Sequence, residues 1–346
     1  MLTNEKGSIM RGKLGAFVII GLLLILSSCA LLDEQAHVDG ELLNGLLDNG
    51  QYEEIVSYLD EKIEEHPDDV YLYKEKGYTL TLIAEANGFQ NDAPSEEALQ
   101  SFERALELDP EHKEAMVGKA LALHYLDRNE EGLTVLEEAS GLSPEIADEH
   151  LVRGHIQSMF EEYDEAIASY EKALEMDDTL TAAYDGLGFT YFMLEDYEQA
   201  EPNFDLYLEH HPKSINGYIG LIEIYNMQER YEETIQLSEK AIEFVPHDDY
   251  GYYTRAYFHV FMEEYEEAIA MYDLIIDSFP GQADGYYGKG VSFAFQGQHE
   301  PAVENLISAA QIDPSIIDDA YESEAYQFLH TNDGWEDVVA QVETAQ

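Results

Sequence analysis

The sequence predicts an all-α fold, an α-solenoid of about nine stacked helix–turn–helix units. Three observations support this prediction: a 34-residue period, apolar residues at helical spacing inside each period, and a proline near the end of most periods. The period is clearest over residues 181–214. Because one helical hairpin cannot bury its own apolar stripe, the units must stack on one another.

The stretch 181–214 contains two predicted amphipathic helices. Their core positions are Tyr184, Leu187, Gly188 and Tyr191 in the first helix, and Ala200, Phe204 and Tyr207 in the second. Gly188 and Ala200 allow the two backbones to approach closely. Pro212 ends the second helix because proline has no amide hydrogen to donate.

The same register extends along the chain. Residues equivalent to Pro212 are Pro67, Pro110, Pro144, Asp178, Pro246, Pro280 and Pro314, and from Pro110 onward the interval is always 34 residues. Small residues recur in the first helix as Gly77, Ala120, Gly154, Gly188, Ala256 and Gly290. In the second helix they recur as Ala98, Gly132, Ala166, Ala200, Ala268 and Ala302.

This pattern resembles the tetratricopeptide repeat. That family has leucine, glycine and tyrosine at places 7, 8 and 11, then alanine, phenylalanine and proline at places 20, 24 and 32, which here are Leu187, Gly188, Tyr191, Ala200, Phe204 and Pro212. The resemblance implies a right-handed superhelix with a concave groove. The predicted array covers residues 36–346, as units 36–69, 70–112, 113–146, 147–180, 181–214, 215–248, 249–282, 283–316 and a C-terminal capping unit, 317–346.

Two departures from the pattern lie inside the array. The second unit has 43 residues, and its nine extra residues are predicted to form a loop near residues 87–94, either a tolerated surface loop or a contact loop for a partner. Pro202 falls within the second helix of the best repeat. It predicts that this helix either begins near Glu201 or is kinked there.

Residues 1–28 are predicted to be a lipoprotein signal peptide. Three basic residues precede the apolar run 14–26, and Leu26-Ser27-Ser28-Cys29 resembles the bacterial lipobox. The resemblance implies cleavage before Cys29, lipid such as palmitate on that residue, and a short tether, 29–35. The predicted location is the extracytoplasmic side of a bacterial membrane, the outer membrane where there are two. The alternative is an uncleaved anchor in which Cys29 is a buried thiol.

The chain is strongly acidic, with 73 acidic against 17 basic residues and a formal net charge of -56. This charge excludes a nucleic-acid partner, because phosphates require a positive surface. Two explanations remain open. Dense charge maintains solubility in salty or alkaline habitats, and it also favours a partner with basic residues.

No catalytic or metal-binding motif is present, so the sequence predicts neither an enzyme nor a cofactor. The histidines are scattered. His150 and His155, for example, lie five residues apart and do not share a helical face.

The resemblance assigns places 2, 5, 9, 12 and 13 of each first helix to the concave surface. Candidate partner-binding residues at place 5 are Tyr253, Tyr287 and Tyr321, and those at place 9 are His155, Phe189 and Tyr257. Place 13 is apolar or aromatic in Tyr125, Met159, Met193, Met227, Phe261, Phe295 and Leu329. The place-13 side chains either line the groove or pack against the adjacent unit.

These observations predict a membrane-tethered scaffold that binds protein partners of the cell envelope in an aromatic, acid-rimmed groove. Tyrosines ringed by carboxylates suit a peptide with apolar anchors and basic flanks. They also suit a sugar chain, so the alternative is a lipoprotein that binds cell-wall glycan.

Overall fold

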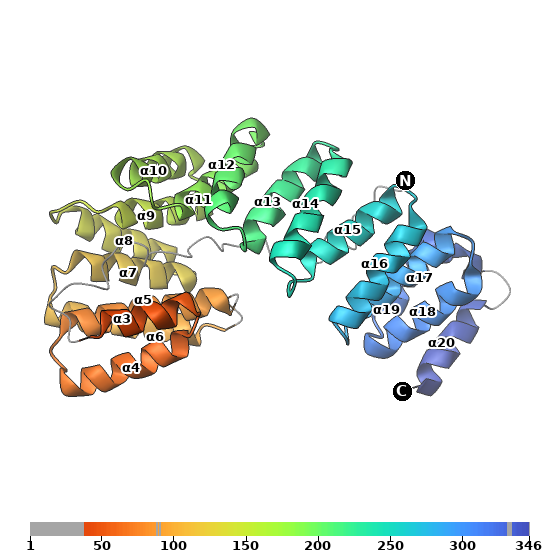
Figure 1. Cartoon of the computed structure of the whole chain (residues 1–346), viewed down its shortest axis with the longest axis horizontal. Helices are drawn as coiled ribbons and strands as arrows, with labels where there is room; N and C mark the ends of the chain where they lie inside the picture. The colour runs from red at the N-terminus through yellow and green to blue at the C-terminus, as the bar shows by residue number, and fades with distance from the viewer. Residues whose placement is uncertain (1–37, 88, 90, 331–333, 346) are drawn as a thin grey trace. The chain divides into compact units, whose positions relative to one another are not determined.

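The computed structural model describes residues 38–87, 89, 91–330 and 334–345, and all regular structure within these ranges is helical (Figure 1). This confirms the predicted all-α fold of repeated helical hairpins. The described residues form two compact units, 38–210 and 211–345, called the N-terminal unit and the C-terminal unit. Each is described separately.

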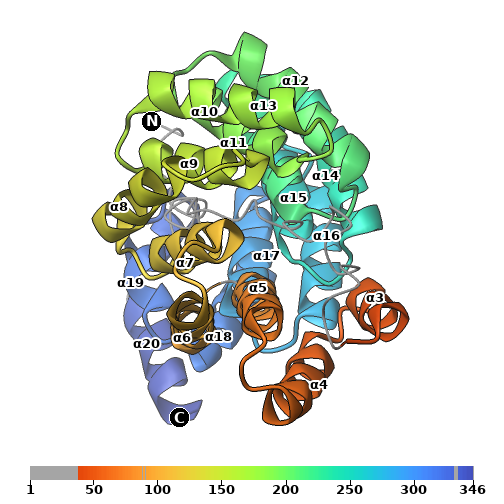
Figure 2. The ribbon, with the colours of Figure 1, turned by 90° about the vertical axis from the view of Figure 1, so that its left-hand side faces the viewer.

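In the N-terminal unit the helices alternate between first and second members of each hairpin. They are α3 (Gly40–Asp48), α4 (Tyr52–Glu65), α5 (Val70–Ala86), α6 (Ala93–Leu108), α7 (Lys113–Tyr125), α8 (Asn129–Ser140), α9 (Ala147–Met159), α10 (Tyr163–Met176), α11 (Ala182–Met193) and α12 (Tyr197–His210). The first helices α5, α7, α9 and α11 contact one another in succession. In Figure 2, α8, α10 and α12 lie on the outer side of α7, α9 and α11.

The C-terminal unit repeats this arrangement. Its helices are α13 (Ile215–Met227), α14 (Tyr231–Phe244), α15 (Tyr250–Phe261), α16 (Tyr265–Ser278), α17 (Ala283–Phe295), α18 (His299–Ile312), α19 (Ile316–Glu322), the 3₁₀ helix η2 (Glu324–His330) and α20 (Gly334–Ala345). Consecutive helices from α13 to α18 pack against each other.

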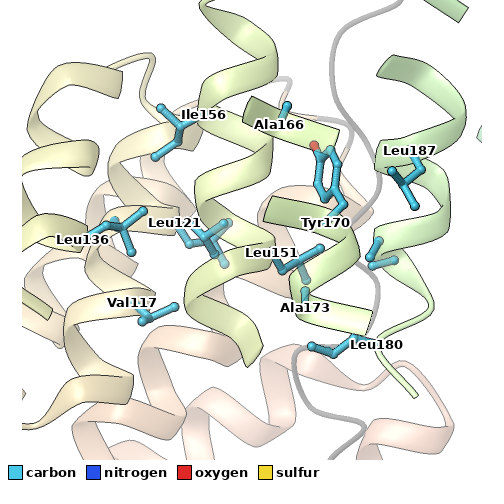
Figure 3. Packing of buried hydrophobic residues seen from close by; sticks show 14 residues of the cluster. Val117, Leu121, Leu136, Leu151, Ile156, Ala166, Tyr170, Ala173, Leu180 and Leu187 are labelled. Carbon is cyan, nitrogen blue, oxygen red and sulfur yellow. The ribbon is translucent and has the colours of Figure 1, made fainter. Parts of the chain in front are cut away.

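In three repeats the aromatic ring at place 24, on the second helix, contacts a glycine of the next hairpin. We call these three residues the wedge rings: Phe102, Tyr170 and Tyr272. A Cβ atom built on Gly154 would lie 2.7 Å from the Tyr170 ring, and one built on Gly186 would lie 2.5 Å from it. Tyr170 therefore touches bare backbone on α9 of its own hairpin and on α11 of the next. Figure 3 shows this ring among the side chains of the same core.

Phe102 meets glycine in both hairpins, and Tyr272 meets it only in the next hairpin, because its own hairpin has Ala256 at place 8. Built Cβ atoms on Gly77 and Gly118 would lie 2.7 and 2.3 Å from Phe102, and one on Gly288 would lie 2.3 Å from Tyr272. All three rings are almost fully buried. The glycine at place 8 was predicted from the sequence, whereas the glycine at place 6 of the following hairpin was not. Its signal was present, since Gly118, Gly186, Gly220 and Gly288 recur in register.

The turn inside most hairpins is closed by a residue with left-handed backbone conformation. These residues are Asp127, Glu161, Glu195, Glu229 and Glu263, with φ between 56° and 63°, and Gly297, with φ of 74°. The amide after each one donates to a carbonyl five residues back, as in Glu162 N to Gln157 O at 2.9 Å and Asp196 N to Tyr191 O at 2.9 Å. This bond satisfies a carbonyl that the helix end leaves free.

The nine extra residues of the second unit do not form only a loop, as the sequence had suggested. Helix α5 has 17 residues where α7 has 13, and α6 has 16 where α10 has 14, so much of the insertion lengthens the two helices. Phe89 from the connection packs edge-on against Tyr125, with ring centroids 4.8 Å apart. The insertion is therefore anchored to the following hairpin by an aromatic contact.

Pro202 lies inside a helix that begins at Tyr197, so the expectation of a start near Glu201 is wrong. Pro202 is exposed. A proline at this place removes one backbone hydrogen bond, and on an exposed face water can bond the carbonyl that is left free.

The last hairpin differs from the predicted helix–turn–helix. Its first helix, α19, ends at Glu322, because Ser323 has an extended backbone with ψ of 134°. The chain then continues as η2 and α20. Within this segment Tyr326 is fully buried, and its hydroxyl lies against α17, where a Cβ on Gly290 would be 2.3 Å away.

We expect Gly186→Ala to lower the free energy of unfolding by about 1–3 kcal/mol, because its methyl group would overlap the Tyr170 ring. Gly45→Ala is the matched control, since Gly45 is exposed in a helix and a Cβ there meets nothing within 4 Å. The control should be neutral or slightly stabilising. Urea denaturation followed by circular dichroism, with hydrogen exchange of α11 amides, measures both. Equal stability of the two variants would contradict the wedge.

Candidate functional site

The C-terminal unit carries the predicted tyrosine ladder on three successive first helices. Tyr253 lies on α15, Tyr287 on α17 and Tyr321 on α19. Tyr253 and Tyr287 are half-buried, and Tyr321 is 51 % exposed. The structure therefore places one partly accessible tyrosine on each of these hairpins, with accessibility greatest at the last.

Tyr253 is held by a hydrogen bond to Gln282, the residue that precedes α17. Its hydroxyl donates to Gln282 Oε1 at 2.8 Å, and Gln282 Nε2 donates to Asp249 Oδ2 at 2.9 Å. Burial raises the pKa of Tyr253, and the negative charges of Asp284 and Asp249 add to this effect. The side chain is neutral at physiological pH, and acidic groups surround it.

Tyr257 and Tyr287 combine packing with partial exposure. Tyr257 is half-buried and lies edge-on to Phe258, with ring centroids 5.2 Å apart. Burial raises the pKa of Tyr257 to about 12, with a further contribution from Tyr231. Tyr287 lies beside the buried Tyr326, with ring centroids 6.1 Å apart. Both rings are held by neighbouring aromatics while part of each remains accessible.

Tyr321 belongs to an exposed aromatic cluster. Its ring stacks on His330, with centroids 4.5 Å apart, and meets Trp335 edge-on at 5.2 Å. Because Tyr321 is the most exposed of the three ladder tyrosines, it offers a partner the most contact area.

His155, which the sequence placed among the groove residues, is buried in the N-terminal unit with 8 % exposure. Its Nδ1 shares a 2.9 Å hydrogen bond with the hydroxyl of Tyr170, which needs a polar partner because it is enclosed by the hairpin core. The ring stacks on His124 at 6.3 Å. Burial, together with a smaller contribution from the nearby His124, lowers the pKa of His155 to about 3. His155 thus supports a wedge ring.

Phe189, the candidate at place 9 of the next hairpin, is half-buried on α11. The place-13 residues do not all behave alike. Met159, Met193 and Met227 are exposed by 36, 45 and 58 %, whereas Tyr125, Phe261 and Phe295 are half-buried and Leu329 is buried. Phe295, for example, stacks on Tyr265 at 6.1 Å. Packing against neighbouring side chains therefore occurs at place 13 in some repeats, whereas the three methionines are exposed to solvent.

A buried carboxyl group beside the insertion was not predicted. Glu85, in the lengthened part of α5, is 6 % exposed and accepts a short hydrogen bond from the hydroxyl of Tyr125. Burial raises the pKa of Glu85 to about 8, although the hydrogen bond from Tyr125 opposes this shift. The other face of Tyr125 is covered by Phe89. The insertion thus creates a protonated acid and an aromatic pair.

A second polar cluster joins α7, α8 and α9. Lys113 Nζ lies 2.9 Å from Glu149 Oε2 and 3.0 Å from the carbonyl oxygen of Leu142, while Arg153 Nη2 lies 3.2 Å from Glu149 Oε1 and 2.8 Å from Ser140 Oγ. Burial opposes ionisation of Glu149, but hydrogen bonds from Ser140 and Lys113 lower its pKa overall. A cavity of about 550 Å³ lies beside this cluster. Since the charged groups satisfy one another, their role is to join the hairpins.

Over the ranges that the structure describes, no three histidine, aspartate, glutamate or cysteine side chains are close enough together to hold a metal ion. Within the same ranges, each helix is either too short or too polar to cross a membrane. Cys29 and the predicted leader lie outside the described residues.

The comparisons with known proteins agree with this geometry. Family profiles described as "Tetratricopeptide repeat" match residues 84–145, from the end of α5 past α8, and residues 150–179, which cover most of α9 and α10. The chain contains tetratricopeptide repeats. Proteins of this repeat family are generally scaffolds without enzymatic activity. No curated protein sequence gives a significant match to the chain.

Solved structures share the fold of this tetratricopeptide repeat protein at low sequence identity. Yeast Tom70 is 16 % identical over 99 % of this chain and 72 % of its own, with a TM-score of 0.55. Cut9, in a hetero-tetramer with Hcn1, is 14 % identical over 72 % of this chain and 48 % of its own, with a TM-score of 0.56. PilF of Pseudomonas aeruginosa is 17 % identical over 64 % of this chain and 97 % of its own, with a TM-score of 0.50.

The pKa of Glu85 predicts a pH dependence of stability. The unfolded chain loses this proton near pH 4.5 and the folded chain near pH 8, so the contribution of Glu85 falls as pH rises through this window. Glu85→Gln keeps an acceptor for Tyr125 and removes the titration. We therefore expect Glu85→Gln to be more stable, relative to the unmodified chain, at pH 8.5 than at pH 5.

Urea denaturation at both pH values measures this difference. The exposed Glu96→Gln, on α6, measures the background effect of removing one surface charge. A relative stability of Glu85→Gln that does not change with pH, or changes only as much as that of Glu96→Gln, would contradict a protonated Glu85.

Proposed function

We propose that this tetratricopeptide repeat protein is a lipid-tethered extracytoplasmic scaffold that binds a partner protein along the tyrosine-bearing first helices of its C-terminal unit. The fold by itself supports a protein-interaction scaffold. The observation that carries the more specific proposal is the ladder of Tyr253, Tyr287 and Tyr321, one per hairpin and each partly accessible.

The ladder is suited to binding because its rings are already ordered. Tyr253 is held by Gln282, and Tyr287 packs against Tyr326. Ordering a side chain on binding costs about 0.5–1.5 kcal/mol, and a ring that is fixed in advance avoids most of that cost. Tyrosine is also enriched among the residues that dominate binding energy, because it combines a large apolar face with a polar tip.

The charge around the ladder favours one kind of partner. Asp249 and Asp284 act on Tyr253, and the chain as a whole is strongly acidic. A segment with apolar anchors and basic flanks would place the anchors against the rings and its cations near these carboxylates. A neutral glycan would stack on the rings and could donate hydroxyl hydrogen bonds to the carboxylates, but it has no positive charge to pair with them, so the charge favours the protein partner.

The tether rests on the sequence around Cys29. One acyl chain gives reversible membrane binding, and two or more give durable anchoring. An array that begins a few residues after Cys29 would lie close to the membrane surface, and its negative charge would repel anionic head groups.

Cys29→Ser should move the protein from the membrane fraction to the soluble fraction or leave an unprocessed, larger precursor, because the residue that would carry lipid is gone. Fractionation, together with incorporation of a labelled palmitate analogue, measures this. Gln35→Asn, which lies in the predicted tether and leaves residues 26–29 unchanged, is the control. Retention of the palmitate label in Cys29→Ser would contradict lipidation at this residue.

A photoreactive amino acid at Tyr321 should crosslink to a discrete envelope protein in cells, because this side chain is exposed at the end of the ladder. Mass spectrometry identifies the product. Tyr253→Ala together with Tyr287→Ala should reduce its yield at least about fivefold, since two contact rings are lost.

The matched control places the same photoreactive residue at Leu274, which lies on α16 and is 49 % exposed. An identical crosslinking pattern from positions 274 and 321 would contradict a specific ladder. Recovery of peptidoglycan fragments from position 321, lost on substitution of the ladder tyrosines, would replace the protein partner with a glycan.

A further inference from the structure

Two neighbouring hairpins of the N-terminal unit expose a pair of large apolar side chains at the turn between their helices. Met159 and Phe160 end α9 with 36 and 38 % exposure, and Met193 and Leu194 end α11 with 45 and 43 %. We call these four residues the edge patch. Adjacent pairs of exposed apolar side chains are costly in water and often mark an interaction surface.

The two pairs lie on helices in direct contact. Helices α9 and α11 pack against each other, and Ser158 Oγ lies 3.5 Å from Thr190 Oγ1. Ser158 immediately precedes Met159, and Thr190 is one helical turn before Met193 and Leu194. The edge patch therefore combines the ends of two adjacent helices into one surface.

The preceding hairpin does not share this exposure. There the equivalent residues are Tyr125 and Leu126, and both are half-buried. Tyr125 is covered by Phe89 and bonded to Glu85. Within the N-terminal unit, the insertion thus covers the apolar side chains at the turn of that hairpin, whereas those at the next two turns are exposed to solvent.

The rim of the edge patch is acidic and lacks the cation found in the preceding turn. In that turn Arg128 pairs with Glu131 through two contacts of 2.7 Å. The equivalent residues beside the edge patch are Glu162 and Asp196. Exposed acidic residues in these two turns and the first helical turns that follow are Glu161, Glu162, Asp164, Glu165, Glu195, Asp196 and Glu198.

We propose that the edge patch binds an amphipathic α-helix of a partner protein, with apolar side chains on one face and lysine or arginine on its flanks. Methionine fills irregular gaps because its side chain is flexible and polarisable, which suits a docking surface for a helix. The carboxylates supply the complementary charge. An anionic membrane would be repelled by the same rim. This surface is distinct from the tyrosine ladder and does not depend on it.

The probe is the synthetic peptide LKKLLKLLKKLLKL, whose leucines and lysines segregate on a helix. The full-length chain, in nanodiscs of zwitterionic lipid, carries a photoreactive residue in place of the exposed Gln199, next to the edge patch. The measurement is the yield of peptide crosslinked to the chain at 0.15 M salt. Met193→Gln with Leu194→Gln should reduce this yield at least about tenfold, because the apolar contact is lost.

Three controls isolate the edge patch. Leu206→Gln changes a residue of similar exposure, 39 %, on α12, and should leave the yield within about twofold. The peptide LEELLELLEELLEL tests the sign of the charge, and a peptide of lysine and serine with the same net charge tests the apolar face. Both should crosslink weakly. Circular dichroism verifies that the variants fold.

Several results would overturn the proposal. No crosslinking of the leucine–lysine peptide, an unchanged yield in the double variant, or an equal loss in Leu206→Gln would each do so. An equal yield with the lysine–serine peptide would show attraction by charge alone. Binding of phosphatidylglycerol vesicles that is lost in the double variant would reassign the surface to lipid.

Discussion

The wedge rings determine how consecutive hairpins fit together. Tyr170 is enclosed by backbone at Gly154 and Gly186, which belong to different hairpins, so one ring fixes both the pairing of helices within a unit and the spacing between units. Close packing of this kind leaves no room for an added methyl group. The polar hydroxyl of Tyr170 needs a hydrogen-bond partner inside the core, and His155 supplies it. This explains why His155 is buried although its place was expected to face the groove.

This packing separates the first helices into a buried face and a face on which side chains can vary. In the C-terminal unit the variable places hold tyrosines that neighbouring side chains hold in position while part of each ring stays accessible. In the N-terminal unit the corresponding places include Val117 and Leu151, which are buried in the core. The same scaffold therefore offers an aromatic surface in one unit and an edge patch in the other.

Many of the acidic residues lie at helix N-termini, where negative charge stabilises the helix. Carboxylates occupy the first turns of most second helices, as with Glu53 and Glu54 in α4 and Glu232 and Glu233 in α14, where the helix dipole favours negative charge. Buried acids behave differently. Burial raises the pKa of Asp185 to about 7 and that of Glu85 to about 8, so these groups keep their protons to higher pH than surface carboxylates do. The buried Glu149 has a lowered pKa and pairs with Lys113 and Arg153, so its negative charge is matched by neighbouring cations.

The sequence by itself determined the repeat, its helices and the residues that pack at their crossing, because the 34-residue period and the small residues at fixed places report directly on burial. It also located the tyrosine ladder. It did not determine the length of α5 and α6, the uninterrupted α12 around Pro202, or the break after α19, because helix ends depend on which backbone groups neighbours cover. The environments of His155, Tyr253 and Met193 were decided only by the tertiary structure. Each occupies a place that looks equivalent from repeat to repeat, but the side chains around that place differ between repeats.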